Sequence, residues 1–259
     1  MILAVDIGNT NTVLGFFDNK KLISSIRLSS DIRRTEDEWE YLIRNIMEQK
    51  KVNISECNGA ILSSVVPGIN TPISRAIKNI IGLDVIMVGP GTKTGLKILY
   101  EDPKEVGADR IVNAVGVKAK YGYPAIIIDL GTATTFCVID EKGDYLGGII
   151  SPGIKIAADS LFEKTAKLPR VDLIAPKNFL NKNTVESIKS GIIFGHIGQI
   201  EYLVKNLKQE QKIENAKVIA TGGLARVLDK YTDAFDIIDN DITLFGLLEI
   251  YEKNITNNK

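Results

Sequence analysis

The feature that most constrains the fold is a short pattern that occurs twice. Residues 5–12, VDIGNTNT, align with residues 128–135, IDLGTATT, and share the aspartate, the glycine and the last threonine. Each copy starts in one short apolar run and leads into another, which is typical of two strands joined by a tight turn. The order of expected elements around the two copies also repeats. We therefore predict an internal duplication.

The elements expected from apolar periodicity and turn residues follow the same order in both halves. In the first half we expect strands at 2–5, 12–17, 22–28, 60–64 and 84–88, with a helix after Thr35 and another at 69–80. In the second we expect helices at 110–120, 154–163 and 184–207 and from 224 and 242, with strands at 125–128, 134–139, 145–150, 216–220 and 235–238. Thr35 and Glu38 have capping-box spacing. The order predicts an α/β fold of two domains, 1–112 and 113–259, each a mixed sheet flanked by helices.

Charge and composition exclude several classes of protein. Thirty-two basic and thirty-two acidic residues cancel, so no net field would attract nucleic acid or an anionic membrane. His196 is the single histidine, which excludes a multi-histidine metal site and argues against a histidine-based triad. Two cysteines are too few for a disulfide framework, and we expect both to be free thiols. The chain shows neither a signal-peptide pattern nor a membrane-length apolar run, so we expect a cytoplasmic protein.

The first copy, here called the first loop (residues 6–13), has the composition of a phosphate-binding turn. Asp6 ends a strand and could hold a hydrated Mg²⁺, and the turn at Gly8 could direct backbone N–H groups toward a phosphate. Short donor side chains follow at Asn9, Thr10, Asn11 and Thr12. An ordinary β-hairpin is the alternative, because Gly-Asn is a good turn pair.

The second copy, here called the second loop (residues 129–135), makes a chance hairpin less plausible. Two such loops facing each other could hold a nucleotide triphosphate from both sides. A third glycine turn, Thr221-Gly222-Gly223, precedes an expected helix whose N-terminus would suit an anion or a nucleotide. The three features together resemble the actin-like, ribonuclease-H-like superfold of ATPases and sugar kinases, which implies two duplicated ribonuclease-H-like domains.

Two further motifs narrow the resemblance. They are Gly107-Ala108-Asp109-Arg110 and the segment GGIISPG at 147–153. With both loops and the third glycine turn, they resemble type III pantothenate kinase in family order from residue 6 to residue 223; the segment least anchored by motif is 164–183. The resemblance implies transfer of the γ-phosphoryl group of ATP to the primary hydroxyl of pantothenate, the first step of coenzyme A synthesis.

The same resemblance implies roles for individual residues in catalysis. Asp109 would orient the substrate hydroxyl and accept its proton late, since phosphoryl transfer depends mainly on alignment and charge neutralisation. Arg110 would offer a planar fork to the substrate carboxylate. Without the resemblance, this pair is equally well explained as an aspartate at a helix N-terminus followed by a surface arginine.

Further roles concern ATP, ions and the substrate pocket. The resemblance assigns ATP binding to Asp6, Ile7, Gly8, Asn9, Thr10, Asn11, Thr12, Val13 and Thr132, with Mg²⁺ near Asp6. Asp129 would bind a monovalent cation, K⁺ or NH₄⁺; neither loop contains the lysine that a Walker-type site uses against phosphate charge. The substrate pocket would comprise Tyr100, Gly107, Ala108, Asp109, Arg110 and Thr184. Alternatively, Tyr100 is an aromatic residue on a loop and Thr184 a helix N-cap.

The glycines around the histidine point to close helix packing. His196 lies in an apolar helical stretch, so we expect a histidine in the core or at a subunit interface rather than a catalytic one. Gly191, Gly195 and Gly198 are spaced for the close approach of another helix. The resemblance implies a homodimer with the substrate pocket near its interface.

Two other functions remain open at this level. One is a kinase for another small acid or sugar, against which the motifs at 107–110 and 147–153 argue. The other is a regulatory protein that kept the fold and lost the activity. Such a protein should lack one of the key carboxylates, yet Asp6, Asp109 and Asp129 are all present.

Overall fold

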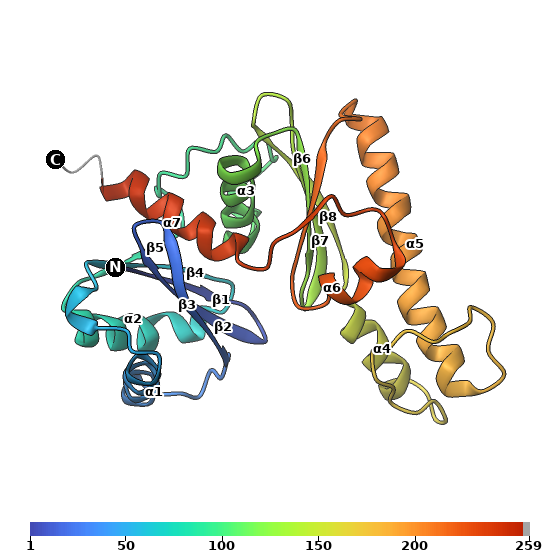
Figure 1. The fold of residues 1–259 in the computed structure, drawn as a ribbon, viewed down its shortest axis with the longest axis horizontal. Helices are drawn as coiled ribbons and strands as arrows, with labels where there is room; N and C mark the ends of the chain where they lie inside the picture. Colours follow the sequence, from blue (N-terminus) through green and yellow to red (C-terminus); the bar gives the residue numbers. More distant parts are fainter. Residues whose placement is uncertain (256–259) are drawn as a thin grey trace. The chain divides into compact units, whose positions relative to one another are not determined.

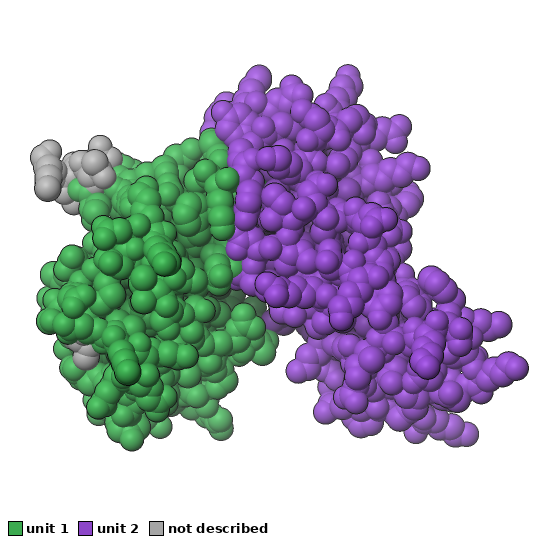
Figure 2. Space-filling view, in the orientation of Figure 1, with its two compact units in different colours: residues 1–96, 100–120, 241–259 green, residues 97–99, 121–240 purple. Residues whose placement is uncertain are grey.

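The structure, a computed structural model, describes residues 1–255 apart from the side chain of residue 54. The chain packs as two compact units (Figures 1 and 2). Unit 1 comprises residues 1–96, 100–120 and the C-terminal segment from Asp241, and unit 2 comprises residues 97–99 and 121–240. Neither cysteine is in a disulfide, as expected. No helix within 1–255 combines the length and the apolar character needed to cross a membrane.

Unit 1 is built on a five-stranded mixed sheet. Its strands are β1 (Ile2–Ile7), β2 (Asn11–Asp18), β3 (Lys21–Ser29), β4 (Gly59–Ser64) and β5 (Val85–Met87), in the order β3-β2-β1-β4-β5. The first three strands are antiparallel, and β1, β4 and β5 are parallel. Its helices are α1 (Glu36–Gln49), α2 (Pro67–Ile81), α3 (Ala108–Tyr121) and α7 (Ile242–Ile255).

Unit 2 repeats this arrangement. Its strands are β6 (Ala125–Leu130), β7 (Ala133–Ile139), β8 (Tyr145–Pro152), β9 (Lys217–Thr221) and β10 (Ile237–Ile238), in the order β10-β9-β6-β7-β8. Read from β8, this is the order of the first sheet, with the same antiparallel and parallel pairings. Its helices are α4 (Ile154–Glu163), α5 (Thr184–Gln211) and α6 (Ala225–Leu228). The predicted duplicated α/β fold is confirmed.

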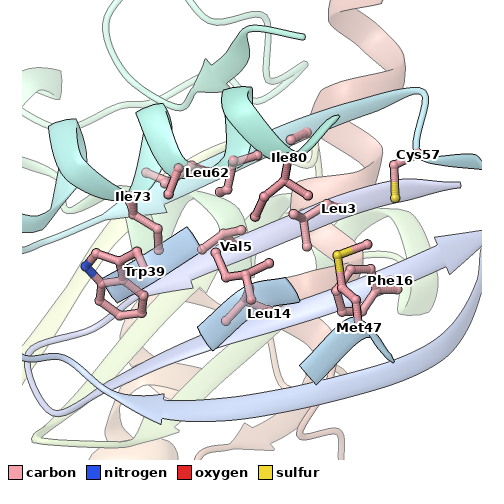
Figure 3. Packing of buried hydrophobic residues seen from close by; sticks show 14 of the residues in the cluster. Leu3, Val5, Leu14, Phe16, Trp39, Met47, Cys57, Leu62, Ile73 and Ile80 are labelled. Atoms are coloured by element: carbon pink, nitrogen blue, oxygen red, sulfur yellow. The ribbon is translucent and has the colours of Figure 1, made fainter. Parts of the chain in front are cut away.

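Helices α1 and α2 cover one face of the first sheet (Figure 3). Trp39 and Met47 of α1 and Ile73 of α2 are fully buried against apolar strand residues. Thr35 accepts a hydrogen bond from the backbone N–H of Glu38, whose carboxylate accepts one from the Thr35 backbone, so the predicted capping box is present. This cap fixes where α1 begins.

Helix α7 contacts β1, β2 and β4 of the same sheet. Gly15 of β2 and Gly59 of β4 leave room for α7 side chains, because a Cβ atom on either glycine would collide with Leu244 or Tyr251, respectively. A segment that follows the last strand of the chain thus completes the core of the first sheet.

The packing units do not coincide with the ranges 1–112 and 113–259 predicted from the repeat. Residue 112 lies inside α3, which packs in unit 1 to its last turn, and α7 also belongs to unit 1. Gly116 and Gly246 lie where α3 and α7 cross, with no space for a side chain on either. The boundary near residue 112 remains a prediction about the duplicated halves, and residues 256–259 of the second range lie outside the described residues.

The helix expected from Leu224, whose N-terminus was predicted to suit an anion or a nucleotide, is short. It is the four-residue α6, followed by a 3₁₀ turn at Asp229–Tyr231. A single turn aligns fewer peptide dipoles than a full helix, and the anion-binding role of the Thr221–Gly223 turn stays a prediction. Gly222 has a φ of +96°, and its missing side chain lets the backbone of Leu130 approach closely.

The α3–α7 crossing gives a first prediction. In Gly246→Ala the new methyl group would meet the carbonyl oxygen of Val112, and neither helix backbone can yield easily. We expect the free energy of unfolding, measured by urea denaturation, to fall by about 1–3 kcal/mol. Gly68→Ala in α2 is the control, since the nearest atom is 4.0 Å from the new methyl group, and it should stay within about 1 kcal/mol of the wild type. Equal stabilities would contradict the proposed close contact.

Candidate active site

The first loop is a tight turn at the end of β1. The Gly8 N–H donates to the carbonyl oxygen of Asn11 at 2.9 Å, and Ile7 pairs with Thr12 across the hairpin. Asn9 and Thr10 are exposed at the tip of the turn, and Val13 lies opposite Asp6 in β2. The eight predicted residues 6–13 therefore form one continuous turn with its flanking strand ends.

A buried serine holds the carboxylate of this loop. Ser63 of β4 is fully buried, and its hydroxyl donates to Oδ1 of Asp6 at 2.6 Å. The two residues are register partners in the parallel pairing of β1 with β4, so both side chains lie at the edge where these strands end. A carboxylate oriented in this way suits a hydrated divalent cation. Sequence reasoning missed Ser63, although its position at the end of an apolar strand was a usable signal.

Asp109 lies in the first turn of α3, in unit 1. The Arg110 N–H donates to Asp109 Oδ1 at 2.8 Å. Gly107 has no side chain for a steric reason, since a Cβ there would stand 2.5 Å from the same oxygen. Burial raises the pKa of the Asp109 carboxyl, while the Arg110 backbone N–H and charge act against this rise. The arrangement is a desolvated carboxylate with raised proton affinity, which suits a general base.

Arg110 is buried and lies close to Tyr100. Only 5% of Arg110 is exposed, and its guanidinium carbon lies 5.9 Å from the centre of the Tyr100 ring. The alternative of a surface arginine is therefore wrong. Two residues predicted for the substrate pocket from separate segments are brought together on unit 1.

The second loop is shaped by its own backbone. Asp129 lies near the end of β6, Thr132 is exposed at the turn, and the Gly131 N–H donates to the carbonyl oxygen of Ala133 at 3.1 Å. Gly153, which precedes α4, donates its N–H to the carbonyl oxygen of Thr132 at 3.2 Å. A side chain on Gly153 would collide with that carbonyl group. The last glycine of the segment 147–153 is thus explained by its contact with the second loop.

Thr184 is the first residue of α5, and Asn183 is the cap. The Asn183 side chain accepts the Glu186 N–H at 2.9 Å, so the alternative of Thr184 as N-cap is wrong. Thr184 lines an open hollow of about 600 Å³ on unit 2, together with Leu168, Ser187 and other residues near the start of α5. This volume falls within the range of small-molecule sites.

His196 is a packing residue. It is buried on α5, and its Nε2 lies 3.0 Å from Oγ1 of Thr134 in the second loop. Burial lowers its pKa below the usual value, which keeps the imidazole neutral. The predicted structural role is confirmed, and the histidine fixes α5 to the strand that carries the second loop.

Comparisons with known proteins agree with this geometry. A conserved protein of Campylobacter jejuni, provisionally described as a Baf family transcriptional activator, aligns over 98% of this chain and 99% of its own at 20% identity, with a TM-score of 0.62. The ethanolamine utilization protein EutJ of Carboxydothermus hydrogenoformans aligns over 96% of this chain and 89% of its own at 14% identity, with a TM-score of 0.53. At these identities the likeness concerns the fold alone.

The two sheets share one strand order, and each half carries an aspartate-bearing turn between its first two strands, which is the duplicated α/β architecture predicted from the sequence. A sequence model of the type III pantothenate kinase family matches residues 2–206, and the chain belongs to that family. It is a kinase that phosphorylates pantothenate with ATP and a divalent metal, in coenzyme A biosynthesis. The Thr221–Gly223 turn lies beyond the matched residues.

The buried histidine gives a second prediction. Because burial lowers its pKa below 6.5, the unfolded chain binds this proton more tightly than the native one. Stability from His196 is therefore present above about pH 6.5 and lost as the pH falls below it. We expect the free energy of unfolding to fall less between about pH 7.5 and 5.5 in His196→Gln than in the wild type. The Asp109 carboxyl, whose pKa is raised, has the opposite effect on stability, but it is present in both proteins and its contribution cancels in the comparison. Equal pH dependences of the free energy of unfolding in the two proteins would contradict the lowered pKa of His196.

Proposed function

We propose that the first loop and the 107–110 motif of unit 1 perform the phosphoryl transfer, and that the residues of the second loop also contribute to binding ATP. The observation that carries this proposal is Asp109, a desolvated carboxylate next to a buried arginine in an enzyme of this family.

Asp109 acts as the general base. Its carboxylate accepts the proton of the primary hydroxyl of pantothenate as that oxygen bonds to the γ-phosphorus of ATP, and the bond from the γ-phosphorus to the bridging oxygen of ADP breaks. The raised pKa favours this role, because a carboxylate with greater proton affinity is a better base near neutral pH. The hydrogen bond from the Arg110 N–H, at 2.8 Å, orients the Asp109 carboxylate. The absence of a side chain at Gly107 leaves room for the carboxylate in this orientation.

The first loop binds the phosphates of ATP. The N–H groups of its turn and the exposed side chains of Asn9 and Thr10 are the donors. Asp6, oriented by Ser63, would hold Mg²⁺ together with phosphate oxygens. When bound, the metal neutralises charge on the phosphates. No group of three or more His, Cys, Asp or Glu side chains within the described residues could hold a metal ion by itself.

The second loop binds a monovalent cation through Asp129 and contacts ATP through Thr132. Neither loop carries a lysine or arginine, so a cation is needed beside the phosphates. Asp129 supplies the charge, and the exposed turn at Thr132 supplies hydroxyl and backbone groups.

The pantothenate pocket comprises the Tyr100–Arg110 pair with Gly107 and Ala108. Arg110 would receive the substrate carboxylate, because a guanidinium binds a carboxylate through two parallel hydrogen bonds. Its position beside the Tyr100 ring limits its orientations. We propose that Thr184, at the start of α5, also contacts pantothenate. We also propose that the enzyme works in the cytoplasm, where coenzyme A precursors are available.

The enzyme is proposed to be a homodimer that uses an exposed face of α5. Gly191, Gly195 and Gly198 repeat at helical spacing on this face, and none has a neighbouring atom within 4 Å of an added Cβ. Tyr202 continues the same face and is 67% exposed. Because these glycines have no such neighbour among the described residues, they are available to pack against a second helix.

A third prediction tests the reaction. ATP consumption by the wild type should require both pantothenate and K⁺, and Asp109→Asn should lower it by about 100-fold or more. Its free energy of unfolding should equal or exceed that of the wild type, since the amide removes a desolvated charge and can still accept the Arg110 N–H. Asp102→Asn, a carboxylate-to-amide change on an exposed residue of the preceding segment, should keep full activity. Pantothenate-dependent turnover that survives Asp109→Asn would overturn the role of Asp109.

A fourth prediction tests the dimer. Gly195→Glu should halve the mass measured by sedimentation, because a charged side chain would enter the proposed interface while the single chain has room for it. Gly68→Glu, which also has room in the single chain, should leave the mass unchanged. A monomeric wild type, or a dimeric Gly195→Glu variant, would count against this interface.

A further inference from the structure

The segment between β3 and α1 is attached to the first loop at two points. The backbone N–H of Ser30 donates to the carbonyl oxygen of Thr10 at 3.0 Å. The hydroxyl groups of Ser30 and Thr12 lie 2.9 Å apart and form a hydrogen bond. Thr12 is fully buried, so its hydroxyl depends on this partner. The tip of the turn and the start of β2 are therefore both held by one serine outside the loop.

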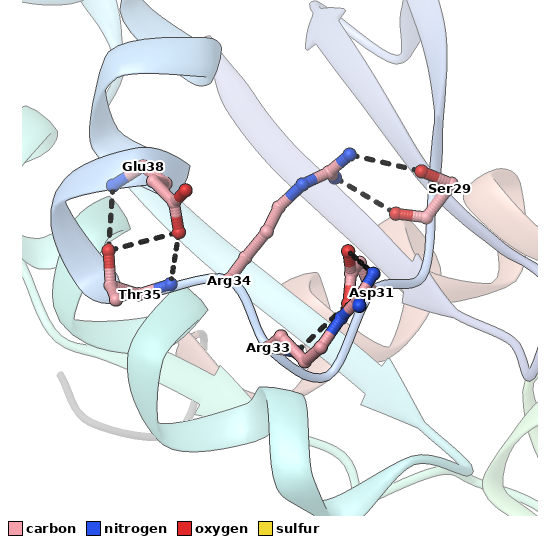
Figure 4. A network of polar contacts seen from close by, with 6 residues as sticks. All are labelled: Ser29, Asp31, Arg33, Arg34, Thr35 and Glu38. Atoms are coloured by element: carbon pink, nitrogen blue, oxygen red, sulfur yellow. Dashed lines mark hydrogen bonds and ion pairs between the residues drawn. The ribbon is translucent and has the colours of Figure 1, made fainter.

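Arg34 is hydrogen-bonded to Ser29, the residue directly before Ser30. Its Nη1 donates to the carbonyl oxygen of Ser29 at 2.9 Å, and its Nη2 donates to the Ser29 hydroxyl at 3.0 Å (Figure 4). The guanidinium carbon also lies 5.0 Å from the centre of the Trp39 ring. Since Trp39 is fully buried in the core, Arg34 connects a rigid part of unit 1 to the residue next to Ser30.

The neighbouring arginine shows that this arrangement is specific to Arg34. Arg33 is 87% exposed and pairs with Asp31 in two hydrogen bonds of 3.1 Å. The Arg33 side chain is directed to Asp31 within the segment, whereas that of Arg34 is directed to Ser29 (Figure 4). Two adjacent arginines of equal charge thus differ in their contacts, which provides a matched control.

We propose that Arg34 is a positioning residue for ATP binding: it holds Ser29 and Ser30 so that Thr10 and Thr12 keep the first loop in its phosphate-binding shape. This inference rests on the proposed role of the first loop. The physical reason is preorganisation, because N–H groups that already point in the required direction lose less entropy when a phosphate binds. Arg34 itself is occupied by Ser29 and is not assigned a contact with ATP.

The alternative is that Arg34 only anchors the start of α1. In that case replacing Arg34 would lower the free energy of unfolding but would not weaken the binding of ATP more than that of pantothenate. The two possibilities differ in selectivity: a positioning role predicts weaker binding of phosphate-bearing nucleotides and an unchanged KM for pantothenate.

The test compares Arg34→Met with Arg33→Met. Calorimetric titration with ATP and ADP should show about tenfold weaker binding to Arg34→Met, as expected for losing hydrogen bonds from a charged group. The KM for ATP should rise similarly while the KM for pantothenate stays constant. Arg33→Met should bind as the wild type does. Arg34→Lys, which keeps the charge and one donor at a time, should lie between Arg34→Met and the wild type.

A double-mutant cycle tests the route through Ser30. Ser30→Ala alone should weaken ATP binding, and the variant with both Ser30→Ala and Arg34→Met should be no weaker than Arg34→Met, since both changes remove the same support. This cycle can also be run with Arg34→Lys if Arg34→Met does not fold. Unchanged ATP affinity in folded Arg34 variants would overturn this inference. So would losses of affinity from Ser30→Ala and Arg34→Met that simply add in the double variant. Neither result would affect the proposed role of the first loop. A wild type that binds no ATP would overturn the proposed role of the first loop and this inference with it.

Discussion

The arrangement of the site depends on the parallel pairing of β1 with β4. This pairing brings the ends of two strands, more than fifty residues apart in sequence, to one edge, where Ser63 meets Asp6. In the second sheet, the pairing of β6 with β9 brings Thr221 level with Asp129 in the same way. A strand shifted by one residue would turn these side chains to the opposite face. Correct register in two buried sheets is therefore a condition for the chemistry.

The two loops carry the same Asp-x-Gly sequence pattern, but different contacts hold each of them in place. The first loop is held by side-chain hydrogen bonds from Ser63 to Asp6 and between Ser30 and Thr12, and by a backbone hydrogen bond from Ser30 to Thr10. At the second loop, His196 contacts the Thr134 hydroxyl, and two glycine backbones also pack closely: the N–H of Gly153 reaches Thr132 and Gly222 lies against Leu130. Side-chain support can be altered one group at a time, whereas backbone contact at a glycine tolerates almost no substitution. Close glycine contacts of this kind are therefore the part of the second loop's support that is least open to substitution.

Local signals predicted most elements, and distant contacts account for what was missed. The capping box at Thr35 and the repeated Asp-x-Gly turn are local, and both occur as expected. Ser63 and Ser30 were missed because their partners lie far away in sequence. The short α6 and the packing of α7 in unit 1 were missed because apolar periodicity predicts a helix but neither its neighbours nor its length. The cap at Asn183 was missed because adjacent Asn and Thr are both good caps.

One feature of the core has a use beyond stability. Trp39 is the only tryptophan of the chain, and its ring lies 5.0 Å from the guanidinium carbon of Arg34. Indole emission responds to a nearby cation, and here no second indole contributes background. The protein therefore carries a single native fluorophore close to the segment that supports the first loop. Nucleotide titrations can follow this segment in unmodified protein, without an attached dye.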